Sequence, residues 1–180
     1  MFVRRLVTGR DSEGKSVFLS DGPTPRTVVF KSIPGHAFAQ VWATSPSPSL
    51  SGQFPDPTQE QPGLIPSTGG TSLLIVTFPP DSAMADPQFD AAAAGAEYME
   101  AMPDLTKTFE PDNPGMHTTD SVDYGLVLSG DICLELDDGQ QRELHPMDVV
   151  VQNGTRHAWR NKSDKPATVA FFMIGAARTS

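Results

Sequence analysis

The sequence is poor in cysteine. It contains one Cys among 180 residues, Cys133, so no intramolecular disulfide can form. Cys133 lies between apolar neighbours in a strand-like run, which favours inert packing over a reactive thiol. The fold therefore has to be held by its core and its hydrogen bonds.

Basic residues and long apolar segments are also scarce. Thirteen Lys and Arg stand against 22 Asp and Glu, and the net charge of −9 argues against nucleic acid or anionic membrane partners. No apolar run reaches the roughly 18 residues of a membrane span. Arg4 and Arg5 resemble the basic start of a signal peptide, but no apolar segment follows them. We therefore expect a cytoplasmic protein that binds neither nucleic acid nor membrane.

Short alternating or β-branched runs are frequent. They occur at 123–128, 132–136 and 149–152, and turn residues such as Asp138-Gly139 separate them. This pattern predicts antiparallel strands joined by tight turns. Earlier strand candidates are 1–8, 17–19, 27–30, 38–44 and 71–78.

Two segments depart from the strand pattern. Four consecutive alanines predict a helix over 89–102, although Gly95 lowers its stability by about 1 kcal/mol. This helix would pack on the outer face of the sheet structure or form a lid at its mouth. The segment 44–70 holds six prolines and predicts a long loop draped on the domain, with an interdomain linker as the alternative.

The length predicts one domain that spans residues 1–180. Within it, 1–78 would supply N-terminal strands and the Pro-rich loop, 79–114 the helix or lid, and 115–175 the remaining strands.

The segment 115–161 resembles the two short motifs of the cupin superfamily. For the first motif, His117 and Gly130 stand at the expected spacing, with Thr119 in place of the second histidine and Asp123 in place of the glutamate. For the second motif, Gly154, His157 and Asn161 fit the spacing.

This resemblance implies an all-β fold: a cupin-type antiparallel β-barrel, or jelly roll, with an N-terminal strand extension and one short helix. It also implies a homodimer, and we expect the N-terminal strands or the 44–70 loop at its interface because exposed sheet edges need covering.

Imidazole and carboxylate groups inside a small barrel suit a divalent first-row metal. We expect His117, Asp123 and His157 to bind Fe, Mn, Ni or Zn. Two alternatives remain open. The histidines are interior groups without metal, or Asp123 is not a ligand and instead anchors a ligand histidine through the second nitrogen of its ring. The residues expected to line the substrate pocket are Thr119, Gln152, Trp159 and Asn161.

Several other polar residues are expected outside the site. His36 follows the turn residues Pro34-Gly35 and reads as a surface residue, with a pocket position as the alternative. Tyr124 neighbours Asp123 on a strand and should face outward. His145 precedes Pro146 and should lie in an exposed loop.

The favoured function is a metal-dependent enzyme that acts on a small organic acid or carbonyl compound, of the decarboxylase, lyase or dioxygenase type. The alternative is a non-catalytic cupin that binds a small molecule in the same cavity. No general base is identifiable from the sequence; His36 and a helix glutamate are the only candidates.

Overall fold

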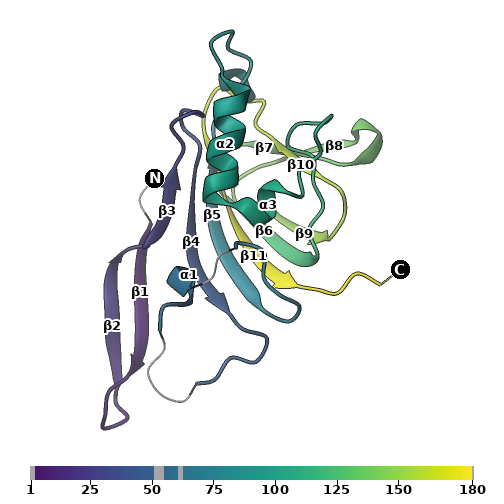
Figure 1. The fold of residues 1–180 in the computed structure, drawn as a ribbon. Helices are drawn as coiled ribbons and strands as arrows, with labels where there is room; N and C mark the ends of the chain where they lie inside the picture. Colours follow the sequence, from purple (N-terminus) through teal and green to yellow (C-terminus); the bar gives the residue numbers. More distant parts are fainter. Residues whose placement is uncertain (1–2, 51–54, 61–62, 180) are drawn as a thin grey trace.

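The computed structural model describes residues 3–50, 55–60 and 63–179, and within them the chain forms antiparallel sheets with a few short helices (Figure 1). The strands are β1 (Arg4–Arg10), β2 (Ser16–Pro23), β3 (Arg26–Val29), β4 (Ala37–Thr44), β5 (Thr71–Phe78), β6 (Ser121–Ser129), β7 (Ile132–Glu135), β8 (Gln141–Leu144), β9 (Val149–Asn153), β10 (Ala158–Arg160) and β11 (Ala167–Gly175). The helices are α1 (Pro57–Glu60), α2 (Ala91–Ala101) and α3 (Pro103–Thr106), with 3₁₀ turns at Asp81–Ala83 and Asp137–Gly139.

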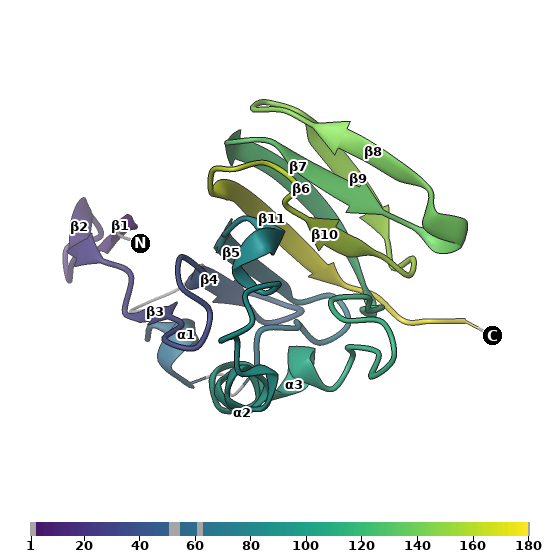
Figure 2. The ribbon, with the colours of Figure 1, turned by 90° about the horizontal axis from the view of Figure 1, so that it is seen from above.

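The main sheet has six strands in the order β3-β4-β5-β11-β6-β9, and a smaller sheet has the order β10-β7-β8. Neighbouring strands are antiparallel in both sheets. The smaller sheet packs against one half of the main sheet, and α2 and α3 lie beside the other half (Figure 2). This confirms the expected all-β cupin-type barrel.

Two apolar clusters fill the space between these layers. One joins α2 to the main sheet through Phe38, Leu74, Ala94, Met102 and Met173. The other joins the two sheets through buried side chains at Val127, Ile132, Ala167 and Val169. The inner face of the main sheet is therefore covered by a helix on one side and by strands on the other.

Tight turns fall where the sequence predicts them. Asp138 and Gly139 both have positive φ, at 58° and 67°, and connect β7 to β8. Gly130, the last residue of the first motif, has φ 71°, and a side chain there would clash with the carbonyl of Pro166. Glycine at 130 is thus required by both backbone conformation and space.

Helix α2 confirms the helix expected over 89–102. Asp90 caps its N-terminus by accepting hydrogen bonds from the amides of Ala92 and Ala93 at 3.0 Å each. The short helices α1 and α3 were not expected, because a single turn leaves no periodic pattern in the sequence. None of the described helices is long and apolar enough to cross a membrane.

The hairpin of β1 and β2 projects from the rest of the domain (Figure 1). It carries three exposed apolar side chains, Leu6, Phe18 and Leu19. The homodimer expected from the sequence stays a prediction. Of the Pro-rich segment, 51–54 and 61–62 lie outside the described residues, while Leu64 is buried in the core, as expected of a loop that packs on the domain.

Candidate functional site

A cavity of about 760 Å³ lies between α2, the inner face of the main sheet and strand β10. Most of its wall is apolar. The apolar lining side chains include Phe38, Leu64, Leu74, Val76, Phe78, Phe89, Leu105, Phe109, Trp159, Phe171 and Met173. A few polar groups interrupt this wall: His36, Asp81, Tyr98, Thr106, Glu110, His117, Thr119, Asp123, His157 and Arg160.

His117 and His157, called the histidine pair below, lie side by side on the cavity wall. Their backbones exchange two hydrogen bonds of 2.9 Å, and their ring centroids are 4.3 Å apart. Nδ1 of His117 lies 3.0 Å from the carbonyl oxygen of Gly115, and Nδ1 of His157 lies 2.9 Å from that of Thr155. A carbonyl oxygen only accepts, so each Nδ1 carries the proton and each Nε2 keeps a free lone pair.

Both imidazoles of the histidine pair favour the neutral form. Burial and the neighbouring His117 lower the pKa of His157 to about 4, although its hydrogen bond to Thr155 opposes the shift. Burial also lowers the pKa of His117. The pair therefore presents two basic nitrogen atoms to the cavity at neutral pH.

Asp123 lies on β6 and also lines the cavity. Its side chain is buried, and Oδ1 has no hydrogen-bond partner. Burial raises the pKa of Asp123, and a hydrogen bond from Ser121 opposes this shift. A buried carboxyl oxygen without a partner inside a cavity is available to a bound molecule.

Thr119 and Trp159 lie on the cavity wall as well. Thr119 Oγ1 accepts a hydrogen bond of 3.0 Å from the hydroxyl of Ser121, which stands two residues before Asp123. Trp159 lies over Gly125 of β6, where a Cβ atom would stand 3.4 Å from the indole ring. The indole of Trp159 therefore packs directly against strand β6.

Two of the expected pocket residues do not line the cavity, and this corrects the sequence-based assignment. Gln152 turns toward its own loop and donates to the carbonyl of Thr155 at 3.1 Å. Asn161 donates to the carbonyls of Phe78 at 3.0 Å and Lys165 at 2.8 Å. Both amides satisfy buried backbone groups, which sequence spacing does not reveal.

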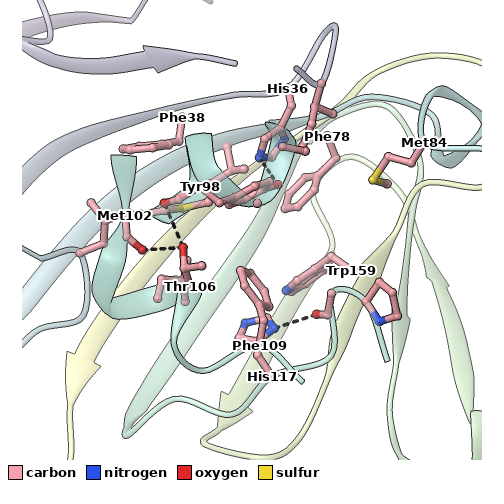
Figure 3. A pocket seen from close by; sticks show the side chains of 18 of the residues that line it. His36, Phe38, Phe78, Met84, Tyr98, Met102, Thr106, Phe109, His117 and Trp159 are labelled. Carbon is pink, nitrogen blue, oxygen red and sulfur yellow. Dashed lines mark hydrogen bonds between the residues drawn. The ribbon is translucent and has the colours of Figure 1, made fainter. Parts of the chain in front are cut away.

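His36 is not a surface residue: it is 5% exposed and lines the cavity. Its Nδ1 lies 2.9 Å from the carbonyl of Thr77, and its Nε2 lies 2.8 Å from the hydroxyl of Tyr98 on α2 (Figure 3). The sequence carried one signal for this position. His36 stands two residues before Phe38, so in an extended segment the two side chains share a face, and both line the cavity. Tyr98 was not expected at the site. As predicted, Tyr124 and His145 are exposed.

Seven rings form a closed belt around the cavity, and neighbouring centroids in it are 4.3–6.5 Å apart. In order, this aromatic belt is His36, Tyr98, Phe109, His117, His157, Trp159 and Phe78, which returns to His36 (Figure 3). Phe109 lies between the histidine pair and the hydrogen-bonded residues Tyr98 and His36 on one side of the belt. Trp159 and Phe78 lie between them on the other side. The belt is thus suited to a planar ring with polar groups on opposite edges.

The histidine pair supplies part of a metal site. Two neutral imidazoles with free Nε2 atoms suit several divalent first-row metals, and backbone carbonyls hold both rings in orientation. Among residues 3–50, 55–60 and 63–179, however, no three His, Cys, Asp or Glu side chains gather closely enough to hold a metal ion. The structure fits a two-histidine arrangement and does not bring Asp123 into a ready three-ligand set. Ligation by His117, Asp123 and His157 stays a prediction.

Comparisons with known proteins identify relatives over nearly the whole chain. Residues 107–174 match the model of a family described as "Cupin domain". The phomopsin biosynthesis cluster protein C' of Diaporthe leptostromiformis is 34% identical over 165 residues, which cover 88% of this chain and 70% of the relative. A cupin-domain-containing oxidoreductase of Aspergillus ruber is 32% identical over 182 residues, which cover 96% of this chain and 72% of the relative.

Among solved structures, a cupin domain of a transcriptional regulator from Enterobacter cloacae is 15% identical, with a TM-score of 0.36. The match covers 59% of this chain and 83% of that one.

Proposed function

The chain belongs to the cupin superfamily, and from that premise we propose that it is an enzyme acting on an apolar, ring-containing carbonyl compound bound in the aromatic belt. The observation that carries this proposal is the composition of one cavity. Two neutral imidazoles and an unpartnered buried carboxyl group stand on a wall that is otherwise apolar and aromatic. Cavities of this kind bind carbon-rich ligands and use their few polar groups to orient them.

The polar groups favour a carbonyl over a carboxylate. Arg160 is the one Lys or Arg side chain among the described lining residues, and its Nε is paired with Glu135 at 2.6 Å. Its Nη1 donates to the carbonyl of Pro114 at 2.6 Å. A carboxylate would therefore meet no uncommitted cation and would face the acidic side chains of Asp81 and Glu110. Of the two substrate classes expected from the sequence, we keep the carbonyl compound.

Proton transfer next to the carbonyl is the chemistry that these side chains perform best. An Nε2 of the histidine pair takes a proton from the carbon beside the carbonyl, because both rings favour the neutral form and keep this lone pair free. In this proposal Asp123, whose pKa burial raises, acts in its protonated form and donates a hydrogen bond to the carbonyl oxygen, where negative charge develops. The apolar wall excludes water and strengthens both interactions.

The relatives support an enzyme in general terms. The Aspergillus ruber relative is described as an oxidoreductase, and the Diaporthe relative belongs to a biosynthesis cluster. A divalent metal bound by the histidine pair would occupy these Nε2 lone pairs and would supply Lewis acid polarisation of the same carbonyl in place of the free base. The steps above need only the side chains of this chain.

Binding of 2-naphthaldehyde, compared with pyruvate, tests the substrate class. We expect calorimetry to detect the naphthaldehyde and not pyruvate. Ala94 is buried on α2 and lines the cavity, so Ala94→Trp should fill it and abolish binding. Ala93→Trp is the matched control, because Ala93 lies on the same helix, is exposed and does not line the cavity. Equal binding to the two tryptophan variants would remove the cavity from the proposal.

Proton exchange in 2-tetralone separates an enzyme from a binding protein. The hydrogen atoms on the carbons next to its carbonyl exchange with deuterium from D₂O, and NMR follows the loss of their proton signals. We expect the protein to accelerate exchange about 100-fold or more, and His157→Ala to lose this acceleration while still binding 2-naphthaldehyde. Binding without accelerated exchange would favour the non-catalytic alternative.

A further inference from the structure

A second polar site lies on the aromatic belt, across from the histidine pair. It consists of Tyr98 on α2 and His36 in the loop directly before β4, called the tyrosine–histidine pair below. Phe30 packs behind both rings, with centroid distances of 4.7 Å to Tyr98 and 4.6 Å to His36. Both residues line the cavity and both lie outside the segment that matches the cupin domain, 107–174.

The direction of the hydrogen bond between the two side chains is fixed. Thr77 offers only a carbonyl oxygen to Nδ1 of His36 at 2.9 Å, so the proton of the neutral ring is on Nδ1. Nε2 then carries a lone pair and no hydrogen. The hydroxyl of Tyr98, 2.8 Å away, must donate to it.

The hydroxyl oxygen of Tyr98 is consequently left as an acceptor. Its single proton is committed to His36, and burial keeps the phenol neutral by raising its pKa. Among the described residues, none donates a hydrogen bond to the remaining lone pairs of Oη, so a bound molecule can do so. A buried acceptor on a cavity wall gains free energy when a ligand donates a hydrogen bond to it.

The chain holds this acceptor in place by tying α2 to the loop before β4. The carboxylate of Glu97 accepts hydrogen bonds from the backbone amides of Lys31 and Ser32, each at 2.8 Å. Glu97 precedes Tyr98 on the helix, and the two amides lie in the loop that leads to His36. The contact therefore fixes the helix that carries one partner relative to the loop that carries the other.

We infer that Tyr98 recognises a hydroxyl group on the ring-containing ligand, that it does so as a hydrogen-bond acceptor, and that His36 is the positioning residue that sets this polarity. The inference rests on the proposed function, because the carbonyl of the same ligand lies at the histidine pair. The ligand class is then a planar ring compound with a carbonyl on one edge and a hydroxyl on another.

The tyrosine–histidine pair discriminates against an ether at the hydroxyl position. An ether oxygen only accepts, and it would meet an acceptor on Tyr98 with no proton between them. A site built to hydrogen-bond one group rejects an analogue that leaves buried polar atoms unpaired.

The experiment compares 6-hydroxy-2-naphthaldehyde with 6-methoxy-2-naphthaldehyde by calorimetry. We expect wild-type protein to bind the hydroxy compound about tenfold more tightly, and Tyr98→Phe to reduce this preference to about one. Tyr124→Phe is the matched control, since Tyr124 is exposed on the outer face of the sheet, and it should keep the wild-type preference. A preference that survives in Tyr98→Phe overturns the inference.

His36→Phe tests the polarity separately. This variant keeps a ring against Phe30 but removes the acceptor for the Tyr98 proton, which then turns to a ligand oxygen. We expect affinity for the methoxy compound to rise relative to the hydroxy compound; an unchanged ratio would contradict the role given to His36. Failure of wild type to bind unsubstituted 2-naphthaldehyde would overturn the proposed function and this inference together. Equal binding of the two substituted compounds would overturn this inference alone.

Discussion

The histidine pair and the tyrosine–histidine pair are anchored in the same way and differ in what they leave open. In both, an imidazole donates from Nδ1 to a backbone carbonyl, and burial lowers its pKa. In the first pair Nε2 remains open to the cavity. In the second, Nε2 of His36 is closed by the hydroxyl of Tyr98. The same backbone device therefore yields a basic site on one edge of the cavity and a recognition site on the other.

Metal binding should show the largest difference between the two pairs. We expect titration of metal-free protein with Zn²⁺, Mn²⁺ and Ni²⁺ to detect binding that His157→Ala abolishes, because this change removes one of the two imidazoles whose Nε2 is open to the cavity. Asp123→Asn should weaken binding less, by at most about 10–100-fold, because Asp123 does not gather with the pair.

Two controls bound this comparison. His36→Ala should leave metal affinity unchanged, because Nε2 of His36 is closed by Tyr98, and the exposed His145→Ala should do the same. If the wild-type protein binds none of the three ions, the site does not hold a metal. If His157→Ala binds them as tightly as wild type, the metal is not bound by the histidine pair.

Acid should destabilise the protein through His36 and His157 alike. Each keeps a pKa of about 4 in the folded state, mainly because of burial, against about 6.5 when exposed. Between these values the unfolded chain binds more protons than the folded one, so stability is full above about pH 6.5 and falls as the pH drops toward 4. The loss should approach roughly 3 kcal/mol for each histidine.

Urea unfolding between pH 7.5 and 4.5 measures this loss. His36→Gln and His157→Gln should each flatten the dependence, whereas His145→Gln should not, because the hydrogen bond to Asp131 raises the pKa of that exposed ring. A stability that stays constant down to pH 4.5 would show that neither imidazole is held neutral.

Asn161→Ala should destabilise the fold without changing ligand preference. The buried amide of Asn161 donates to Phe78 and Lys165, and its loss leaves those carbonyls unpaired at a cost of roughly 2–3 kcal/mol. Chemical denaturation measures the cost, and calorimetry with the two naphthaldehydes measures the preference. An altered preference at unchanged stability would return Asn161 to the pocket.

The smallest effect is expected from Glu97→Gln. The weaker acceptor loosens the tie between α2 and the loop before β4, so hydroxyl preference should fall a few-fold, less than in Tyr98→Phe. Hydrogen exchange at the amides of Lys31 and Ser32 should accelerate in parallel. Glu100→Gln, exposed on the same helix, is the control, and equal effects from both variants would refute the anchoring role.

The two pairs also differ in how far the sequence predicts them. The histidine pair was expected from the resemblance of residues 115–161 to the two cupin motifs, in which His117 and His157 take histidine positions. The tyrosine–histidine pair joins residues 62 positions apart on a loop and a helix. No local pattern specifies such a contact, although the spacing of two residues between His36 and Phe38 indicates that both side chains take the same face.

The strands were predicted more reliably than the side-chain roles. The run 71–78 is β5 to the residue, since its β-branched and apolar side chains suit only a buried strand. Gln152 and Asn161 were misplaced because spacing indicates which face a side chain takes and not whether a nearby carbonyl captures its amide. Asp123 was placed on the cavity wall, but its distance from the histidine pair is a matter of strand curvature that the sequence leaves open.

The place of β11 in the main sheet has a consequence for how the protein is made. Among the described strands β11 is the last in sequence, yet it lies in the middle of the sheet and pairs with β5 on one side and β6 on the other. During synthesis the edges of β5 and β6 that pair with β11 therefore stay unpaired until residues 167–175 leave the ribosome. Pairing over such sequence separations is slow, and exposed strand edges invite association with other chains. We expect nascent chains that stop before residue 167 to depend on chaperones, and folding of the whole sheet to be a late, nearly all-or-none event.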